Sequence, residues 1–264
     1  MKKIIAILGL LALAACGGGG GGSNLQTLSY YHKSVNDIKD AHAQGITGKN
    51  VKIRVIDFFT GEHSTHGPAV TSVIEKVAPG STITGKYDLN KSKFHEGSSG
   101  NNYDVLNLSI SDDNNYTYYK NQGNIAANPN ALAVVSAGNY NKASETNTVA
   151  KGLVDSSLTT IVVGEVTDNG DKLETYSNHA GQLKNHFIVT AGGHDTKAGT
   201  SFAAPVVSGA AALIMDKFNN TDGETTKNII LDTADDLGAP GVDNIFGHGR
   251  LNIGRALSPV GNVN

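Results

Sequence analysis

Short apolar runs alternate with segments of helical spacing along most of this chain, and this alternation restricts the folds open to it. Strand-like runs are expected at residues 51–56, 105–110, 131–136, 160–163 and 187–190. Helices are expected at residues 35–44, 66–77, 201–217 and 224–233. Strands that are nearly continuous in apolar residues suit a parallel sheet covered on both faces. We therefore predict an α/β fold, a doubly wound and mostly parallel sheet with helices on both faces.

Composition supports a globular domain and argues against nucleic-acid binding. The 264 residues are 39% hydrophobic and 17% charged, so the chain can bury a core and disorder is not expected. The formal net charge of −3 provides no basic field to attract nucleic acid. Tryptophan is absent and the tyrosines are scattered, which leaves no aromatic platform for stacked bases. We expect no nucleic acid among the partners.

The first residues have the features of an export signal. Lys2 and Lys3 precede an apolar run at residues 4–15, which is too short to cross a hydrocarbon core of ~30 Å as a helix. The run ends in the sequence LAAC, which resembles a bacterial lipobox. That resemblance implies a lipoprotein signal peptide at residues 1–15, cleavage before Cys16 and lipid attachment to Cys16. The alternative is an ordinary signal peptide followed by an idle cysteine.

Cys16 is the only cysteine, so it has no disulfide partner within the chain. A run of six glycines follows it and begins a flexible tether at residues 16–34. Such a run resembles the spacers of Gram-negative surface lipoproteins. We therefore expect a lipid membrane as a partner, reached through acylated Cys16. The expected location is the cell envelope, at the outer membrane or cell surface if the source is Gram-negative.

Four short motifs carry residue types suited to nucleophilic catalysis. VID ends a strand at Asp57, HG opens a helix at His66, SAGN follows a strand and ends at Asn139, and GTSFAAP opens the long helix at Ser201. A serine hydroxyl needs an imidazole to take its proton, and the imidazole needs a carboxylate to hold its other nitrogen. The Asn139 amide and the backbone N–H of Ser201 are suited to stabilise an oxyanion.

These motifs, in this order, resemble the subtilisin-like serine proteases (subtilases). The segments that carry the likeness are GITGKNVKIRVID, HGPAV, VVSAGN, AGTSFAAPVVSGAAALI and GHGRLNIGRAL. The resemblance implies a subtilase catalytic domain at residues 35–258, followed by a tail at 259–264. It also implies an endopeptidase that hydrolyses protein or peptide substrates through an acyl-enzyme, without a cofactor. The triad would be Asp57, His66 and Ser201, with Asn139 in the oxyanion hole.

The likeness extends to the substrate cleft, with departures. Leu108, Ser109 and Ile110 resemble the strand that pairs with substrate backbone, but the family usually has glycine where Ile110 stands. This difference alters the expected specificity pocket. His66 follows Asp57 by nine positions, and the family usually has a longer loop there. We therefore expect one wall of the cleft to be smaller.

Other interpretations remain open at each position. Ser201 would suit a helix N-cap, Asp57 and Asn139 would suit turns, and His63 is a nearby rival to His66 as the base. His63 and His66 have no third ligand at suitable spacing, so we expect no metal. The acidic segment 112–115 suits a solvated loop better than a calcium site. A catalytically inactive binding lipoprotein on the same scaffold and an esterase with the same triad are the rival functions.

Overall fold

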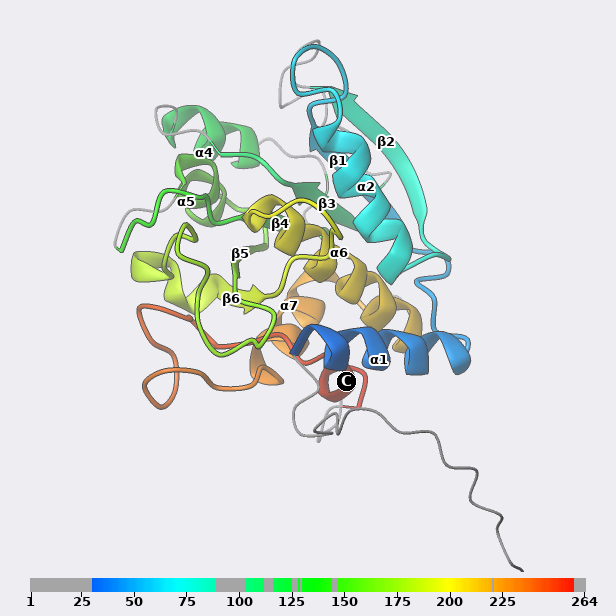
Figure 1. Ribbon diagram of the computed structural model, residues 1–264. Coiled ribbons are helices and arrows are strands. Elements are labelled where there is room, and N and C mark those ends of the chain that lie inside the picture. Colours follow the sequence, from blue (N-terminus) through cyan, green and yellow to red (C-terminus); the bar gives the residue numbers. More distant parts are fainter. Residues whose placement is uncertain are drawn as a thin grey trace, which may run out of the picture.

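The computed structural model describes residues 30–88, 103–111, 116–124, 128, 130–143, 147–219 and 221–258 (Figure 1). Cys16, the glycine run, the acidic segment 112–115 and the tail at 259–264 lie outside these ranges. Expectations about those segments therefore stay predictions.

A six-stranded parallel sheet forms the middle layer, in the order β2-β1-β3-β4-β5-β6. Its strands are β1 (Lys52–Asp57), β2 (Thr82–Asp88), β3 (Val105–Leu108), β4 (Leu132–Ser136), β5 (Thr160–Glu165) and β6 (Phe187–Thr190). Every neighbouring pair is parallel. The prediction of a doubly wound, mostly parallel sheet is confirmed.

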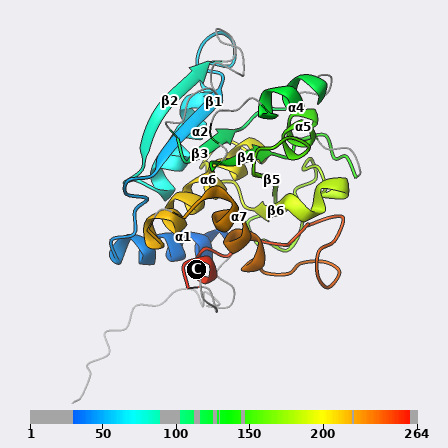
Figure 2. The ribbon, with the colours of Figure 1, turned by 180° about the vertical axis from the view of Figure 1, so that it is seen from behind.

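Helices cover both faces of this sheet (Figures 1 and 2). One core contains residues of α1 (Tyr30–Ala43), α2 (His66–Val77), α6 (Thr200–Lys217), α7 (Gly223–Asp232) and α8 (Ile253–Ala256). The opposite core contains residues of α4 (Tyr116–Asn124), α5 (Thr148–Val154) and the 3₁₀ helix η1 (Gly181–His186). Within β4, Leu132 and Val134 face the first core, while Ala133 and Val135 face the second, because side chains alternate along a strand.

The long helix α6 runs through the first core and is buried along most of its length. It packs tightly against α2, where a Cβ on Gly209 would lie 2.6 Å from the Cβ of Val77. Glycine is therefore needed at this crossing. Within the described ranges, no helix is both long enough and apolar enough to cross a bilayer.

All five predicted strands and all four predicted helices are present, and α2 has the predicted bounds. After β5, an antiparallel bridge between Val166 and Leu173 closes a hairpin turn at residues 168–171. Most other bounds differ by one or two residues, and two of the differences change the interpretation of the sequence. Helix α1 begins at Tyr30, inside the segment expected to be tether, and β3 ends at Leu108, so Ser109 and Ile110 follow the strand.

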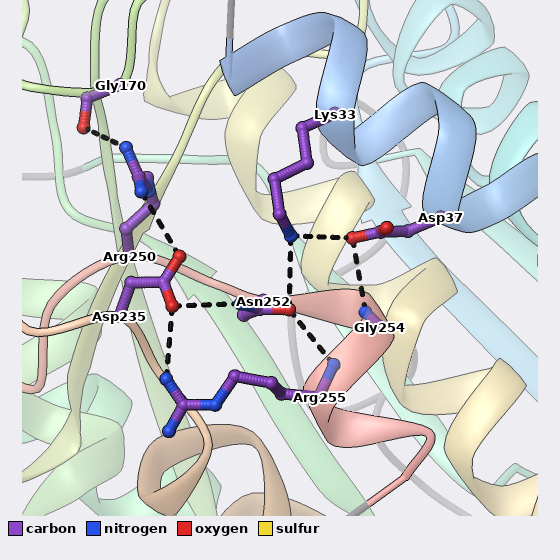
Figure 3. Close-up of polar contacts among 8 residues, drawn as sticks. All are labelled: Lys33, Asp37, Gly170, Asp235, Arg250, Asn252, Gly254 and Arg255. Atoms are coloured by element: carbon purple, nitrogen blue, oxygen red, sulfur yellow. Dashed lines mark hydrogen bonds and ion pairs between the residues drawn. The ribbon is translucent and has the colours of Figure 1, made fainter.

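Helix α1 is fastened to the C-terminal part of the chain (Figure 3). Lys33 Nζ donates to Asp37 Oδ2 at 3.1 Å and to Asn252 Oδ1 at 3.3 Å. The backbone N–H of Gly254 in α8 donates to the same Asp37 oxygen at 3.2 Å. These contacts hold the first described helix against the last one.

Asp235 is the centre of the same polar network (Figure 3). Its carboxylate accepts hydrogen bonds from Asn252 Nδ2 at 2.8 Å and from Arg250 and Arg255 at 3.1 Å each. Arg250 also donates to the Gly170 carbonyl at 3.0 Å. The network therefore links the segment after α7 to the turn after β5.

Candidate active site

Asp57 and His66 meet at the carboxyl edge of the sheet, since Asp57 ends β1 and His66 begins α2. His66 Nδ1 lies 2.6 Å from Asp57 Oδ1, which also accepts the backbone N–H of Phe58 at 2.6 Å. The Asp57 side chain is fully buried, whereas that of His66 is 28% exposed. Burial raises the pKa of Asp57, although the hydrogen bond from His66 opposes the rise. With Nδ1 held by the carboxylate, Nε2 is the ring nitrogen left to accept a proton.

The carboxylate of Asp88, which the sequence analysis did not predict at the site, stabilises the short loop between Asp57 and His66. Asp88 ends β2 and is the register partner of Asp57 in the neighbouring strand. Its Oδ1 accepts the backbone N–H of Phe59 at 3.2 Å, and its Oδ2 accepts the hydroxyl of Thr60. A Cβ on Gly67 would lie 2.7 Å from the Phe58 carbonyl, so only glycine fits where the connection enters α2. The short loop therefore brings the His66 ring within hydrogen-bonding distance of the Asp57 carboxylate.

Ser201 lies in the first turn of α6 and is half-buried. Its hydroxyl donates to the backbone carbonyl of Ser109 at 3.2 Å. Among the described contacts, no hydrogen bond joins it to His66, but the ring of the next residue, Phe202, lies 5.4 Å from the His66 ring. Proton transfer to His66 therefore requires the hydroxyl to turn away from the Ser109 carbonyl.

Asn139 follows β4 and faces solvent, with its side-chain orientation set by Thr200. Its Oδ1 accepts both the backbone N–H and the hydroxyl of Thr200, each at 2.9 Å. The N–H of Gly138 in turn donates to the Thr200 hydroxyl oxygen at 3.1 Å. Since the amide oxygen is occupied, the Nδ2 group is the donor that remains for a ligand. This nitrogen lies 3.3 Å from the position that a Cβ on Gly199 would occupy, two residues before Ser201.

Asn178, fully buried, holds the loop that carries Asn139. Its Nδ2 donates to the Ala137 carbonyl at 2.9 Å, and its Oδ1 accepts the N–H groups of Tyr140 and Lys142 at 3.1 and 3.0 Å. No sequence motif pointed to Asn178, because its role depends on contacts more than thirty residues away.

The three residues expected to bind substrate have buried side chains, and the backbone carbonyls of Ser109 and Ile110 point to different partners. The side chains of Leu108, Ser109 and Ile110 are all buried. The Ile110 carbonyl accepts hydrogen bonds from Asn147 Nδ2 at 2.7 Å and from Ser136 Oγ at 3.1 Å, so it is directed into the protein. Of the three, only Ser109 forms a described contact with Ser201, through its backbone carbonyl.

His63, the rival base, packs its ring against Phe58 with centroids 5.7 Å apart, and no described contact joins it to Asp57. Within the described parts of the chain, no group of three histidine, cysteine or carboxylate side chains is arranged to hold a metal ion.

A second carboxylate that the sequence analysis did not predict at the site, Glu165, supports the turn at residues 199–201, which leads into α6. Glu165 ends β5 and is 5% exposed. Its Oε2 accepts the backbone N–H of Gly199 at 2.8 Å and the hydroxyl of Tyr176 at 3.0 Å. Burial raises the pKa of Glu165 from its ordinary value of 4.5 to about 7, against the effect of these two donors.

This raised pKa predicts that Glu165 makes the fold less stable as pH rises. Between about pH 4.5 and about pH 7, the folded chain retains a proton on Glu165 that the unfolded chain releases. The Glu165 contribution to the free energy of unfolding should fall by on the order of 3 kcal/mol across that window. Urea unfolding of the wild type and Glu165→Gln, at about pH 5 and about pH 8, measures it. Equal pH dependence in the two proteins would contradict the prediction.

Comparison with known proteins decides the family. The subtilase family model matches residues 35–249. The chain belongs to the subtilase family. It is 26% identical to subtilisin DY of Bacillus licheniformis over 259 residues, covering 80% of this chain and 92% of that protein. It is 46% identical to the Neisserial autotransporter lipoprotein NalP of Neisseria meningitidis over 61 residues, which are 23% of this chain and 6% of NalP.

The first curated relatives that this subtilase matches are much longer proteins, and it spans only 6 to 16% of their length. Among solved structures, a lanthipeptide protease superposes with a TM-score of 0.69 at 20% identity, covering 88% of this chain and 94% of that one. This likeness supports the subtilisin-like fold.

Proposed function

We propose that this subtilase is a serine endopeptidase that hydrolyses peptide bonds through an acyl-enzyme. The proposal is carried by the 2.6 Å contact between His66 Nδ1 and Asp57 Oδ1, at the sheet edge where Ser201 lies in the first turn of α6. A buried carboxylate that orients an imidazole beside a serine is the arrangement that activates a hydroxyl nucleophile. Membership of the subtilase family supports the same activity.

In the proposed reaction, Ser201 Oγ attacks the carbonyl carbon of the substrate while His66 Nε2 takes the hydroxyl proton. The Asp57 carboxylate stabilises the imidazolium that forms. Asn139 Nδ2 and the backbone N–H of Ser201 stabilise the oxyanion. His66 then gives the proton to the leaving amine, and a water molecule, activated by the same imidazole, hydrolyses the acyl-enzyme.

Digestion of denatured casein by the purified full chain, with and without pretreatment by a fluorophosphonate, tests this function. We expect cleavage that the pretreatment abolishes. A well-folded chain that neither cleaves casein nor reacts with the probe would support the inactive binding lipoprotein. Hydrolysis of a simple ester without cleavage of casein would support the esterase.

Replacing Asn139 with alanine is expected to lower kcat by about 10²- to 10³-fold with little change in KM. That range was measured on a member of the subtilase family. The reason is that the Asn139 amide would donate to the oxyanion, which exists only in the transition state and the intermediate. Steady-state kinetics on a quenched peptide measures both constants. Asn185→Ala, at an exposed position in η1, is the control and should leave them unchanged. A loss confined to KM would contradict the assignment.

We further propose that the chain is a lipoprotein of the cell envelope, anchored through acylated Cys16. The lipobox-like LAAC sequence and the six glycines that follow support this anchoring. A relative that is itself named a lipoprotein, NalP, gives weaker support because the likeness covers only 23% of this chain.

The anchoring proposal predicts that Cys16→Ser moves the chain out of the membrane fraction. Without the thiol no thioether to a lipid can form, and the mature chain should no longer incorporate labelled palmitate. Fractionation and palmitate labelling of the expressed wild type and variant measure this result. Wild-type chain that carries no label and is recovered in the soluble fraction would contradict the anchor.

A further inference from the structure

A pocket of about 330 Å³ opens at the carboxyl ends of β5 and β6, beside the nucleophile turn. Its lining includes Glu165, Tyr176, Gly192, His194 and Lys197. It lies on the far side of Asn139 from Ser109, because β4 separates β3 from β5 in the sheet. The proposed catalysis uses none of these side chains.

The Glu165 carboxylate has one oxygen engaged and one open. Oε2 holds Gly199 and Tyr176, whereas Oε1 accepts no hydrogen bond from any described residue. A Cβ on Gly192 would lie 2.5 Å from Oε1, so a side chain at this position of the pocket lining would clash with this oxygen. A carboxylate that is 5% exposed and lacks a cation is costly to ionise.

The other charged groups around the pocket do not neutralise Glu165. Asp168 and Glu174 both raise its pKa through their negative charge. Lys197 Nζ donates to the backbone carbonyl and hydroxyl of Thr65, at 3.2 and 3.3 Å. Asp195 pairs with Lys76 at 2.9 Å. In the described structure the pocket is therefore lined mainly by negative charge, and no side-chain cation pairs with Oε1.

Aromatic contacts connect this pocket to the proposed general base. The ring of His194 lies 5.2 Å from Phe202, and Phe202 lies 5.4 Å from His66. In the proposed reaction His66 protonates the leaving amine. The substrate residues after the scissile bond would therefore lie on the side of the site formed by the His66, Phe202 and His194 rings. Ser109, whose carbonyl contacts Ser201, lies toward the opposite side.

We propose that this pocket binds the side-chain cation of an arginine or lysine on the leaving-group side of the substrate, with Glu165 Oε1 as its partner. This proposal deepens the proposed peptidase function and rests on it. A guanidinium would satisfy the open oxygen and offset the cost of charging a buried carboxylate. The raised pKa of Glu165, about 7, agrees with a carboxylate whose cationic partner is missing. A neutral side chain of the same size offers no such compensation.

Binding can be measured without catalysis, using the full chain with Ser201→Ala. Argininamide and citrulline amide have the same shape and differ in whether the side-chain end is charged. At about pH 8, where Glu165 is ionised, we expect argininamide to bind at least tenfold more tightly. Adding Glu165→Gln should abolish this preference, while adding Glu224→Gln, a 57% exposed carboxylate on α7, should retain it. Equal affinity for the two ligands, or a preference that survives Glu165→Gln, would overturn the proposal.

Two further measurements separate this proposal from the peptidase function. Glu174→Gln, a second variant at the pocket, should lower the preference for argininamide even if Glu165→Gln does not fold; an unchanged preference would count against the pocket.

Mass spectrometry of casein fragments should show lysine or arginine enriched within two or three residues after the cuts of the wild type. Cleavage without this enrichment would overturn the proposal and leave the peptidase standing. Argininamide binding without any cleavage would sustain the cation site and refute the peptidase.

Discussion

Replacing Ser201 with alanine is expected to lower kcat/KM on a peptide substrate by about 10⁴- to 10⁶-fold, the scale found for the nucleophile of a related subtilase. The variant has no atom to form the acyl-enzyme. The remaining rate enhancement would come from Asn139 and from substrate binding, which the substitution leaves in place. Initial rates on a quenched peptide, at substrate concentrations well below KM, measure the loss directly.

The matched control is Ser208→Ala, seven residues further along the same helix. Ser208 is fully buried and donates to Asn107 Oδ1 at 2.8 Å, away from the sheet edge. Its loss should cost stability, with less than a tenfold effect on kcat/KM. Comparable losses in the two variants would show that the effect of Ser201→Ala comes from disturbing α6 and not from removing a nucleophile.

Asp57→Asn is expected to lower kcat by about 10⁴-fold, as in other serine triads. In the wild type, Asp57 Oδ1 accepts from His66 Nδ1 at 2.6 Å and thereby leaves Nε2 free to take a proton. An asparagine amide can donate to Nδ1 instead, which places the ring proton on Nε2 and removes the base. The pH profile of kcat, measured with a sensitive ester substrate, should show this loss across the neutral range.

Asp88→Asn is the control for Asp57→Asn, because Asp88 is a buried carboxylate at the same sheet edge. An asparagine there can still accept the Phe59 N–H through its oxygen, and its NH2 group can donate to the Thr60 hydroxyl oxygen, so we expect less than a tenfold loss of kcat. If Asp88→Asn were as damaging as Asp57→Asn, the edge would be sensitive to any loss of charge, and the specific role of Asp57 would be contradicted.

The elements that carry the proposed triad were predictable because their physics is local in sequence. Each strand from β3 to β6 is a short segment dominated by apolar residues, and α2 repeats its apolar residues with helical spacing. Asp57, His66, Asn139 and Ser201 sit at the ends of such elements. Parallel strands bring their carboxyl ends to one edge, so the approximate meeting place followed from the order of the elements.

The missed elements lack such local signals. The edge strand β2 has the sequence TITGKYD, in which polar residues interrupt the apolar run. Helix α4, with the sequence YTYYKNQGN, has no aliphatic stripe, and α5 has only seven residues. These segments are ordered by packing against the sheet and against each other, which overrides their weak propensities.

The supporting polar residues were missed for a different reason. Asp88, Glu165 and Asn178 act on backbone groups that are distant in sequence, such as the Gly199 N–H that Glu165 accepts. Nothing beside them in the sequence marks them as different from strand-end or turn residues. The expected substrate strand illustrates the same limit, since the inward direction of the Ile110 carbonyl depends on Ser136 and Asn147.

The central claim is that Ser201 is an activated nucleophile, and mapping a covalent adduct tests it most directly. The purified full chain is treated with a fluorophosphonate, digested with trypsin, and the modified residue is identified by tandem mass spectrometry. Our account predicts a stoichiometric adduct on Ser201 that is absent from Ser201→Ala and strongly reduced in His66→Ala. A folded chain with no adduct, or with an adduct on another residue that persists in Ser201→Ala, would contradict it.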